Sequence, residues 1–303
     1  MSKKAKFLTF TISVLFLTGL ILVSSRATSP LYPNNYQYDS ALFRFIGKEI
    51  IRRKTPYKDV WDHKGPVLFF IQAIGAWKGT RNAGPNLLFL MQLLSVYVSV
   101  FFLYKTWRML RPDEKNGLRF IFVIVCSYII YSITCEGGNL TEEWCLPLIC
   151  LSIYLLIKYF VSAVDSPKHP LVYAFIHGLC IALIAFIRVN NALTICCGLL
   201  IIGIYLIKNK EWKNLLWNIL FGILGISVVT IPILLWFNAR DALSDMIYAV
   251  FTFNLKYVQV HSYLHYTGKD FWMRALPILA SFIITVLYWL KTRGTKHKIY
   301  DFL

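Results

Sequence analysis

Runs of apolar residues, separated by short polar stretches, follow one another along most of the chain. Several runs approach the roughly 20 residues that a helix needs to cross the ~30 Å core of a bilayer, and flanking aromatic residues or tilting would accommodate the shorter ones. The predicted spans cover residues of about 7–25, 87–107, 119–136, 145–164, 171–187, 192–207, 215–237 and 274–290. The pattern therefore predicts an all-α fold, a polytopic bundle of about eight transmembrane helices forming one membrane domain over residues 1–303.

Two apolar runs are special cases. The first span follows a lysine-rich start, Ser2-Lys3-Lys4-Ala5-Lys6, but it is too long for the apolar region of a signal peptide, so we expect an uncleaved anchor. The run "PVLFFIQAIGAW" (66–77) is too short to cross a bilayer. It predicts a re-entrant or interfacial segment.

A helical apolar pattern with basic residues on the other side occupies residues 38–54. The residues expected on the apolar side are Leu42, Phe43, Phe45, Ile46, Ile50 and Ile51, and those largely opposite are Arg44, Lys48, Arg52 and Arg53. This pattern is typical of a basic amphipathic helix that lies flat in the membrane interface. Residues 238–273 are rich in aromatic side chains and predict an external loop, which forms part of a lid or lies among lipid headgroups.

Lysine and arginine are dense in the connections 105–119 and 208–214 and in the tail 291–298. The positive-inside rule places these segments and the N-terminus in the cytoplasm. Three external stretches then hold the polar chemistry: 26–86, 136–144 and 238–273. The first of them is also basic, which the rule does not explain.

The composition narrows the class of ligand. The chain is 57% hydrophobic with a formal net charge of +17, and its basic residues lie between apolar spans rather than on one soluble face. We therefore reject nucleic acid as a partner and expect phosphate-bearing lipids and anionic headgroups. Seven cysteines form no CxxC pair and are mostly small apolar residues in helices, although Cys135 and Cys145 could pair in an oxidising compartment.

Asp39 lies immediately before the amphipathic pattern, and two roles are open to it. Aspartate is favoured as the N-cap of a helix, but no Glu or Gln follows at the position that would complete a capping box. Alternatively, the carboxylate is a general base that accepts a proton from a hydroxyl nucleophile.

Glu142 and Glu143 follow a glycine pair in "CEGGNLTEEWC" and open the next span. One hypothesis is that they are first-turn acids favoured by the helix dipole. The other is that they bind substrate, either directly or by holding a divalent cation against a phosphate. Asn139 opens an Asn-Leu-Thr sequon here, a pattern that is common by chance.

The stretch "PYKDVWDHKGP" (56–66) places Asp62, His63 and Lys64, which we expect to bind substrate, directly before an apolar run. Lys64 either extends its ammonium group to the interface or pairs with a lipid phosphate and stabilises a departing negative charge. Arg188 interrupts apolar sequence at the end of a span, where a charge is costly, and a guanidinium suits bidentate contact with phosphate.

The order of these motifs resembles the GT-C superfamily of integral-membrane glycosyltransferases. The residues that carry the resemblance are "YQYDSALF", then "GKEIIRRKTPYKDVWDHKGPVLFF", then "GGNLTEEW", over about residues 7–190. The nearest group is the bacterial family-39-like one, related to protein O-mannosyltransferases and aminoarabinose transferases. Many of these proteins have more spans or a soluble C-terminal domain, so we expect a compact or C-terminally truncated variant.

The resemblance implies an inverting glycosyltransferase with a polyprenyl-phosphate sugar as donor. Its acceptor would be a hydroxyl on a glycan, lipid or protein, at the external face of a bacterial inner membrane. Asp39 matches the first-loop catalytic acid, Lys64 the lysine of the Lys-x-Pro motif, and Glu142 or Glu143 the second-loop acid. Arg188 matches, less closely, the basic residues that hold the lipid phosphate.

Two other functions remain open. A transporter or flippase of lipid-linked sugars also needs many spans and basic contacts, but its ionisable residues normally lie near the bilayer midplane. A polysaccharide polymerase or ligase of the O-antigen type would have external loops in which basic residues dominate. The sequence has no phosphate-cradling glycine loop, nucleophile elbow or Rossmann fingerprint, so no soluble nucleotide-sugar site is visible.

Overall fold

The computed structural model describes residues 3–32, 38–76, 84–112, 116–129, 137–163 and 166–256. Within these ranges the chain is helical and contains no strand, so the prediction of an all-α fold is confirmed. The elements are α1 (Lys3–Ser24), α2 (Tyr38–Ile51), α3 (Pro66–Ala76), α4 (Gly84–Leu110), α5 (Asn116–Ile129), α6 (Thr141–Ser162), α7 (Leu171–Ala185), η2 (Val189–Ala192), α8 (Leu193–Lys208), α9 (Trp212–Asn238), α10 (Leu243–Ile247) and η3 (Tyr248–Phe253).

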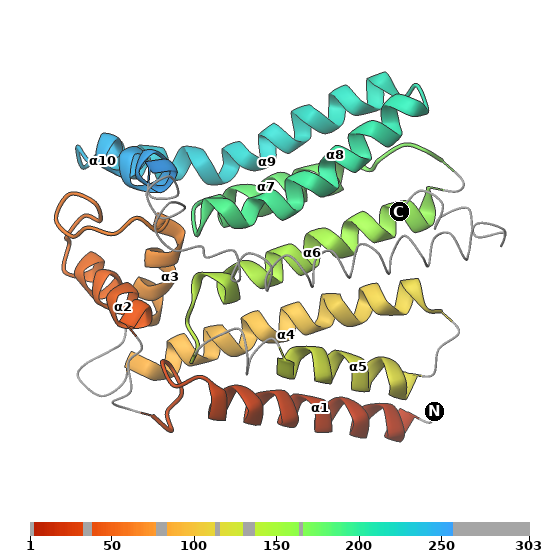
Figure 1. Ribbon diagram of the computed structural model, residues 1–303, viewed down its shortest axis with the longest axis horizontal. Helices are drawn as coiled ribbons and strands as arrows, with labels where there is room; N and C mark the ends of the chain where they lie inside the picture. The colour runs from red at the N-terminus through yellow and green to blue at the C-terminus, as the bar shows by residue number, and fades with distance from the viewer. Residues whose placement is uncertain are drawn as a thin grey trace, which may run out of the picture.

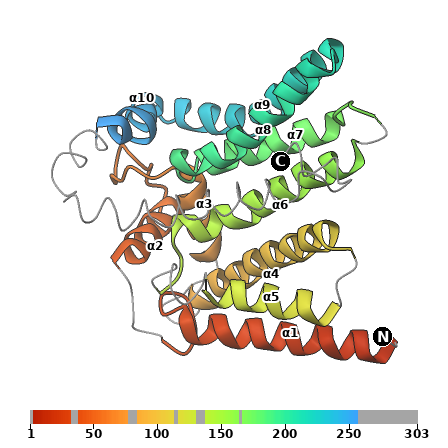
Figure 2. The same ribbon diagram turned by 45° about the vertical axis from the view of Figure 1, so that its right-hand side comes forward.

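The long helices run side by side, successive ones mostly in opposite directions, and the short helices gather at one end of this bundle (Figures 1 and 2). That end, at the left in Figure 1, holds α2, α3, α10 and η3. It also holds the last turns of α1, α7 and α9 and the first turns of α4, α6 and α8. We call it the site end. The last turns of α4 and α8 and the first turn of α9 lie at the opposite end.

Four helical segments of the described chain are long and apolar enough to cross a membrane. They are Leu87–Leu110, Thr141–Ser162, Val189–Lys208 and Trp212–Asn238. Thr11–Ser24, Pro66–Ala76 and Leu171–Ala185 are apolar but shorter. A membrane-spanning helical protein is thus supported, whereas eight crossings stay a prediction. The predicted span 274–290 lies outside the described residues.

Helices α7 and α9 approach closely because glycines form their contact. A Cβ atom added to Gly178 would lie 2.1 Å from the carbonyl oxygen of Gly222, and one added to Gly225 would lie 2.2 Å from that of Phe175. Without a driving force between apolar helices in lipid, such small residues allow the backbones to pack tightly. This close packing fixes the end of α7, from which Arg188 follows.

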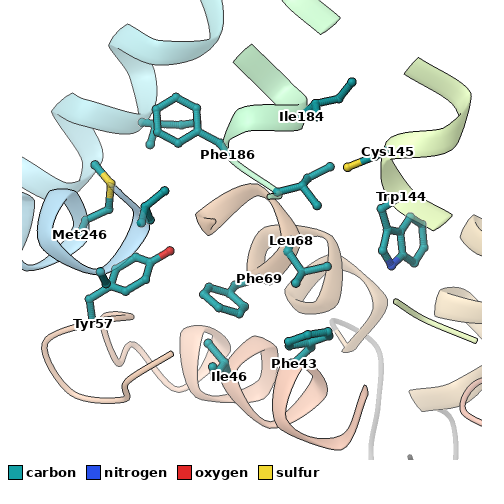
Figure 3. Packing of buried hydrophobic residues seen from close by; sticks show 14 of the residues in the cluster. Phe43, Ile46, Tyr57, Leu68, Phe69, Trp144, Cys145, Ile184, Phe186 and Met246 are labelled. Atoms are coloured by element: carbon teal, nitrogen blue, oxygen red, sulfur yellow. The ribbon is translucent and has the colours of Figure 1, made fainter. Parts of the chain in front are cut away.

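An aromatic and aliphatic core fills the site end (Figure 3). Its buried side chains come mainly from α2, α3, the start of α6 and the end of α7, with others from the loop before α3 and from α4, α8, α9, α10 and η3. Those labelled in Figure 3 are Phe43, Ile46, Tyr57, Leu68, Phe69, Trp144, Cys145, Ile184, Phe186 and Met246. Burying this apolar area stabilises the packing of the short helices against the bundle.

Helix α2 exists as predicted, and its apolar residues divide between the buried core and the exposed surface. Phe43 and Ile46 are buried in the core, while Leu42 and Phe45 are exposed. The backbone of α2 also touches α3 directly, since a Cβ on Gly47 would lie 2.6 Å from the backbone of Gln72. Helix α3 thus covers part of the predicted apolar side, and the position of α2 in the membrane interface stays a prediction.

The region predicted as an aromatic external loop is helical as far as Lys256. It contains α10, the π-helix η3, and a further turn. π-helical turns are uncommon and frequently border functional sites. Residues 257–273 of the predicted loop lie outside the described part of the chain.

Candidate functional site

A pocket of about 280 Å³ opens at the site end. Segments far apart in the sequence form it: the first turn of α2, the loop before α3, the η2 segment after α7, and η3 with the turn that follows. The lining residues are Asp39, His63, Lys64, Gly65, Arg188, Val189, Asn190, Val250 and Asn254. The structure thus brings Asp39, His63, Lys64 and Arg188, all predicted site residues, to one cavity.

The loop that carries Lys64 is held by contacts on both sides of this residue. Asp62, only 5% exposed, accepts a hydrogen bond at Oδ1 from the Lys64 backbone N–H at 2.9 Å. The buried Tyr57 hydroxyl donates to the Lys64 carbonyl oxygen at 2.7 Å. Asp62 does not line the pocket, although it was predicted to bind substrate. Its carboxylate instead shapes the turn.

Gly65 joins this loop to the end of α7. Its N–H donates to the Ile187 carbonyl oxygen at 3.0 Å, and the Val67 N–H donates to the Phe186 carbonyl oxygen at 2.9 Å. A Cβ on Gly65 would lie 2.0 Å from the oxygen of Phe186. Only glycine permits this approach, which places Lys64 on the same wall as Arg188.

Arg188 follows the last turn of α7 and is held from the start of α6. Its guanidinium forms an ion pair with Glu142, and its Nη1 lies 3.4 Å from the Thr141 hydroxyl oxygen. That hydroxyl donates to Glu142 Oε2 at 2.8 Å. The Arg188 side chain is 40% exposed and that of Glu142 is 50% exposed. Glu142 therefore reaches the pocket through Arg188 rather than by lining it.

His63 and Lys64 contact each other inside the pocket. The Lys64 Nζ lies 3.0 Å from His63 Nε2, and His63 Nδ1 lies 3.4 Å from Asp62 Oδ1. Burial lowers the pKa of His63, and the neighbouring Lys64 lowers that pKa further. A neutral imidazole accepts a hydrogen bond at one nitrogen and donates at the other. We therefore assign His63 Nε2 as the acceptor from the Lys64 ammonium.

The Asp39 carboxylate is exposed at the pocket wall. Helix α2 begins at Tyr38, so Asp39 lies in its first turn rather than at the N-cap position that the alternative role needs. Within the described ranges, no hydrogen bond or ion pair engages this carboxylate. Its position leaves it open to a ligand in the pocket.

Comparison with protein families identifies the chain. The family model for the Competence-induced Ccs4 N-terminal domain matches residues 2–298. The chain belongs to this family. No curated protein and no solved structure matches it. The family description names no reaction, and the pocket is the feature of the described chain that bears on its chemistry.

Glu143 has a different place from the one predicted for it. It is 1% exposed and lies outside the pocket lining. Its Oε1 accepts a hydrogen bond from Gln92 Nε2 at 2.9 Å, and its Oε2 accepts one from the Leu140 N–H at 3.1 Å. The carboxylate thus ties the start of α6 to α4. It acts as a first-turn acid, the first of the two hypotheses.

A buried amide network explains the neighbouring sequon. Asn139 is fully buried, with the left-handed backbone angle φ of 62°. Its Oδ1 accepts hydrogen bonds from Gln72 Nε2 at 2.7 Å and Trp144 Nε1 at 3.0 Å, and its Nδ2 donates to the Ser40 hydroxyl oxygen at 2.8 Å. Asn139 therefore joins α2, α3 and α6 behind the pocket, and burial makes it unsuitable as a glycosylation site.

Metal ligands are not grouped in the part of the chain that the structure describes. No cluster of three or more His, Cys, Asp or Glu side chains there could hold a metal ion. The suggestion that Glu142 and Glu143 share a divalent cation finds no geometric support, because Glu143 is buried against α4 and Glu142 pairs with Arg188.

Sequence reasoning did not assign three polar or small residues that the pocket uses. Gly65 was hidden in a charged stretch, and Asn254 in an aromatic one. Asn190 stands beside Arg188 but received no role of its own. Asn190 and Asn254 are polar residues in otherwise apolar or aromatic sequence, and this pattern could have indicated a role in the pocket.

Proposed function

We propose that this protein is a membrane glycosyltransferase that moves a sugar from a polyprenyl-phosphate donor to a hydroxyl acceptor on the external face of the membrane. One observation carries the proposal. An accessible carboxylate, Asp39, shares a small pocket with two cations, Lys64 and Arg188, at the end of a bundle of apolar helices. A base beside a phosphate-binding pair is what displacement of a lipid phosphate requires.

The proposed reaction is a single displacement. Asp39 accepts the proton of the acceptor hydroxyl while its oxygen forms a bond to the anomeric carbon. The bond between that carbon and the phosphate oxygen breaks, and the electron pair leaves with the polyprenyl phosphate. Because attack and departure take place on opposite faces, the configuration inverts. Lys64 and Arg188 stabilise the negative charge that grows on the departing phosphate.

The other predicted residues support these two cations. Glu142 and Thr141 hold one edge of the Arg188 guanidinium. His63 holds the ammonium of Lys64, and Asp62 fixes the turn beneath both. We assign these residues a positioning role in substrate binding. Two fixed cations supply the charge that a divalent cation would otherwise bring to the phosphate.

The size of the pocket suits a headgroup and excludes a whole lipid. Sites that enclose drug-sized ligands span about 300–1,000 Å³, and this pocket has about 280 Å³. A phosphate with its sugar would enter, while the polyprenyl chain would stay among the apolar helices. The basic first loop, which the positive-inside rule leaves unexplained, becomes the phosphate-binding side of the site.

The affinity for a lipid phosphate should decrease when Lys64 loses its charge, and this should happen at a lower pH than for an ordinary lysine. Burial lowers the pKa of Lys64 from its usual 10.5, and nearby Arg188 lowers that pKa further. The ammonium is charged below this lowered pKa, so affinity should fall as pH rises through it. Lys64→Arg should remove the fall, since a guanidinium keeps its charge. Equilibrium binding of polyprenyl phosphate between about pH 7 and 10 measures both.

Transfer itself is tested with membranes that contain the protein, supplied with a panel of radiolabelled polyprenyl-phosphate sugars. We expect label to leave one donor for an acceptor in these membranes, and to remain on the lipid in membranes from cells lacking the protein. Vesicles of the two orientations then give the side of the reaction. Movement of the labelled lipid between leaflets without loss of its sugar would instead establish the flippase alternative, and growth of a lipid-linked chain the polymerase alternative.

A further inference from the structure

The pocket lining contains two chemically different groups of residues. Lys64, Arg188 and Asp39 are charged, and we call them the charged wall. Asn190 and Asn254 are neutral amides, and we call them the neutral wall. Val189 and Val250 accompany these amides. The proposed catalytic step uses the charged wall alone, so the neutral wall needs its own explanation.

Asn254 has part of its hydrogen-bonding capacity committed and part free. Its Nδ2 donates to the His63 and Val250 carbonyl oxygens, both at 2.8 Å, which fixes the amide between η3 and the Lys64 loop. No hydrogen-bond donor among the described residues contacts the Asn254 Oδ1 atom. This leaves a fixed neutral acceptor at the pocket lining.

Asn190 is exposed within η2, and no hydrogen bond from the described residues engages its side chain. Its amide offers two donors and an acceptor to a ligand. Arg188 and Asn190 are separated by a single residue, in a segment anchored by the bond from the Asn191 N–H to the Arg188 carbonyl oxygen at 3.1 Å. A group that Asn190 contacts is therefore adjacent to whatever anion Arg188 binds.

A sugar on a lipid phosphate meets both requirements. It is joined to phosphorus through one oxygen atom, so its ring must lie next to the phosphate. Its hydroxyls pair with amide donors and acceptors, and its C–H face packs on small apolar side chains such as valine. A cationic amino sugar fits less well, because Asp39 is the one carboxylate that the described residues contribute to the lining, and it acts as the base.

We propose that Asn190 and Asn254 form the sugar-recognition wall of the pocket, and that the donor carries a neutral, hydroxyl-rich sugar. This inference rests on the proposed function, since it assumes that the phosphate occupies the charged wall. Asn190 is the more informative residue to change, because Asn254 also holds the His63 loop in place.

The test compares the affinities of two ligands for the purified protein: unmodified polyprenyl phosphate and the same lipid carrying mannose or glucose. In the wild type, one of the sugar-bearing lipids should bind more tightly than the bare lipid. Asn190→Ala should weaken the sugar-bearing lipid by about 2- to 10-fold, the loss of a hydrogen bond or two, and leave the bare lipid unchanged. The control is Asn209→Ala, at the opposite end of α8, which should change neither affinity.

The remaining outcomes contradict specific parts of the account. Equal weakening of both ligands by Asn190→Ala would mean that Asn190 serves the phosphate, and an unchanged affinity for both would remove it from the site. Either result overturns the sugar-recognition wall while the phosphate site stands. If the wild type binds neither lipid, the proposed function itself fails. Preferential binding of an aminoarabinose-bearing lipid would contradict the neutral sugar.

Discussion

Replacing Asp39 by asparagine is expected to reduce sugar transfer by about 10²–10⁴-fold, the usual contribution of a general base. The amide has nearly the shape of the carboxylate but cannot accept the proton of the attacking hydroxyl. Because Asp39 is exposed and free of partners in the described chain, the substitution should not disturb folding. Loss of one negative charge should leave the affinity for polyprenyl phosphate equal or higher. Transfer rates and lipid binding at matched protein concentration measure the two effects.

Asp245→Asn is the matched control, because this carboxylate is also exposed in a short helix of the site end but does not line the pocket. It should leave the transfer rate unchanged. Transfer that survives Asp39→Asn at its full rate would refute the role of Asp39 as base. A comparable loss of transfer in both variants would mean that the net charge of the site end, rather than Asp39 itself, determines the rate.

Gly65→Ala is expected to destabilise the site end severely. The new Cβ would lie 2.0 Å from the oxygen and 2.2 Å from the carbonyl carbon of Phe186, and these backbone atoms cannot rotate away as a side chain would. The cost should reach or exceed the roughly 1–3 kcal/mol typical of overpacking. The hydrogen bond from the Gly65 N–H to Ile187 would be strained, and Lys64 would move away from Arg188. The unfolding temperature in detergent and the affinity for polyprenyl phosphate should both decrease.

Gly203→Ala provides the control within a helix. Within the described chain, no atom outside the local helix backbone lies within 4 Å of the Cβ that this change adds to α8, and alanine favours the helix by up to about 1 kcal/mol. Its unfolding temperature should equal or exceed that of the wild type. A Gly65→Ala protein with wild-type stability and lipid affinity would show that the loop can separate from α7 without consequence, contrary to the geometry described above.

Hydropathy predicted the long apolar helices of the described chain, and it was least reliable at their polar ends. The span predicted at 87–107 lies within α4, which extends to Leu110. The span predicted from residue 145 begins earlier, at Thr141, because Glu142 and Glu143 belong to the first turn of α6. Acids are stabilised at a helix N-terminus by the helix dipole, so hydropathy alone truncates such a helix.

Arg188 could be predicted because an isolated charge in apolar sequence has few inexpensive positions. Asp39 and Lys64 were predicted from their places before an amphipathic helix and before an apolar run, and all three residues line one pocket. The sequence could not separate Glu142 from Glu143, because adjacent helical residues point in directions about 100° apart and the partner helices were unknown. Gln92 on α4 determines which of the two acids is buried.

The neutral polar residues required the structure. Gln72 and Asn139 pair across 67 positions of the sequence, and their bond makes sense only once α3 and the start of α6 are adjacent. Buried amides need hydrogen-bond partners, and these partners are adjacent in only one arrangement of the helices. The same residue type at Asn190 is exposed in a pocket instead. Residue type alone does not distinguish these two situations.

The most direct test of the central claim is the binding of polyprenyl phosphate to the purified protein, since it requires neither the sugar nor the acceptor to be known. We predict saturable binding to the wild type. Arg188→Gln should weaken it at least 10-fold, the lower range for loss of a charge-assisted hydrogen bond, whereas Arg240→Gln, an exposed arginine at the same end, should not. Equal affinity in the wild type and Arg188→Gln, or binding to neither, would contradict a phosphate site in this pocket.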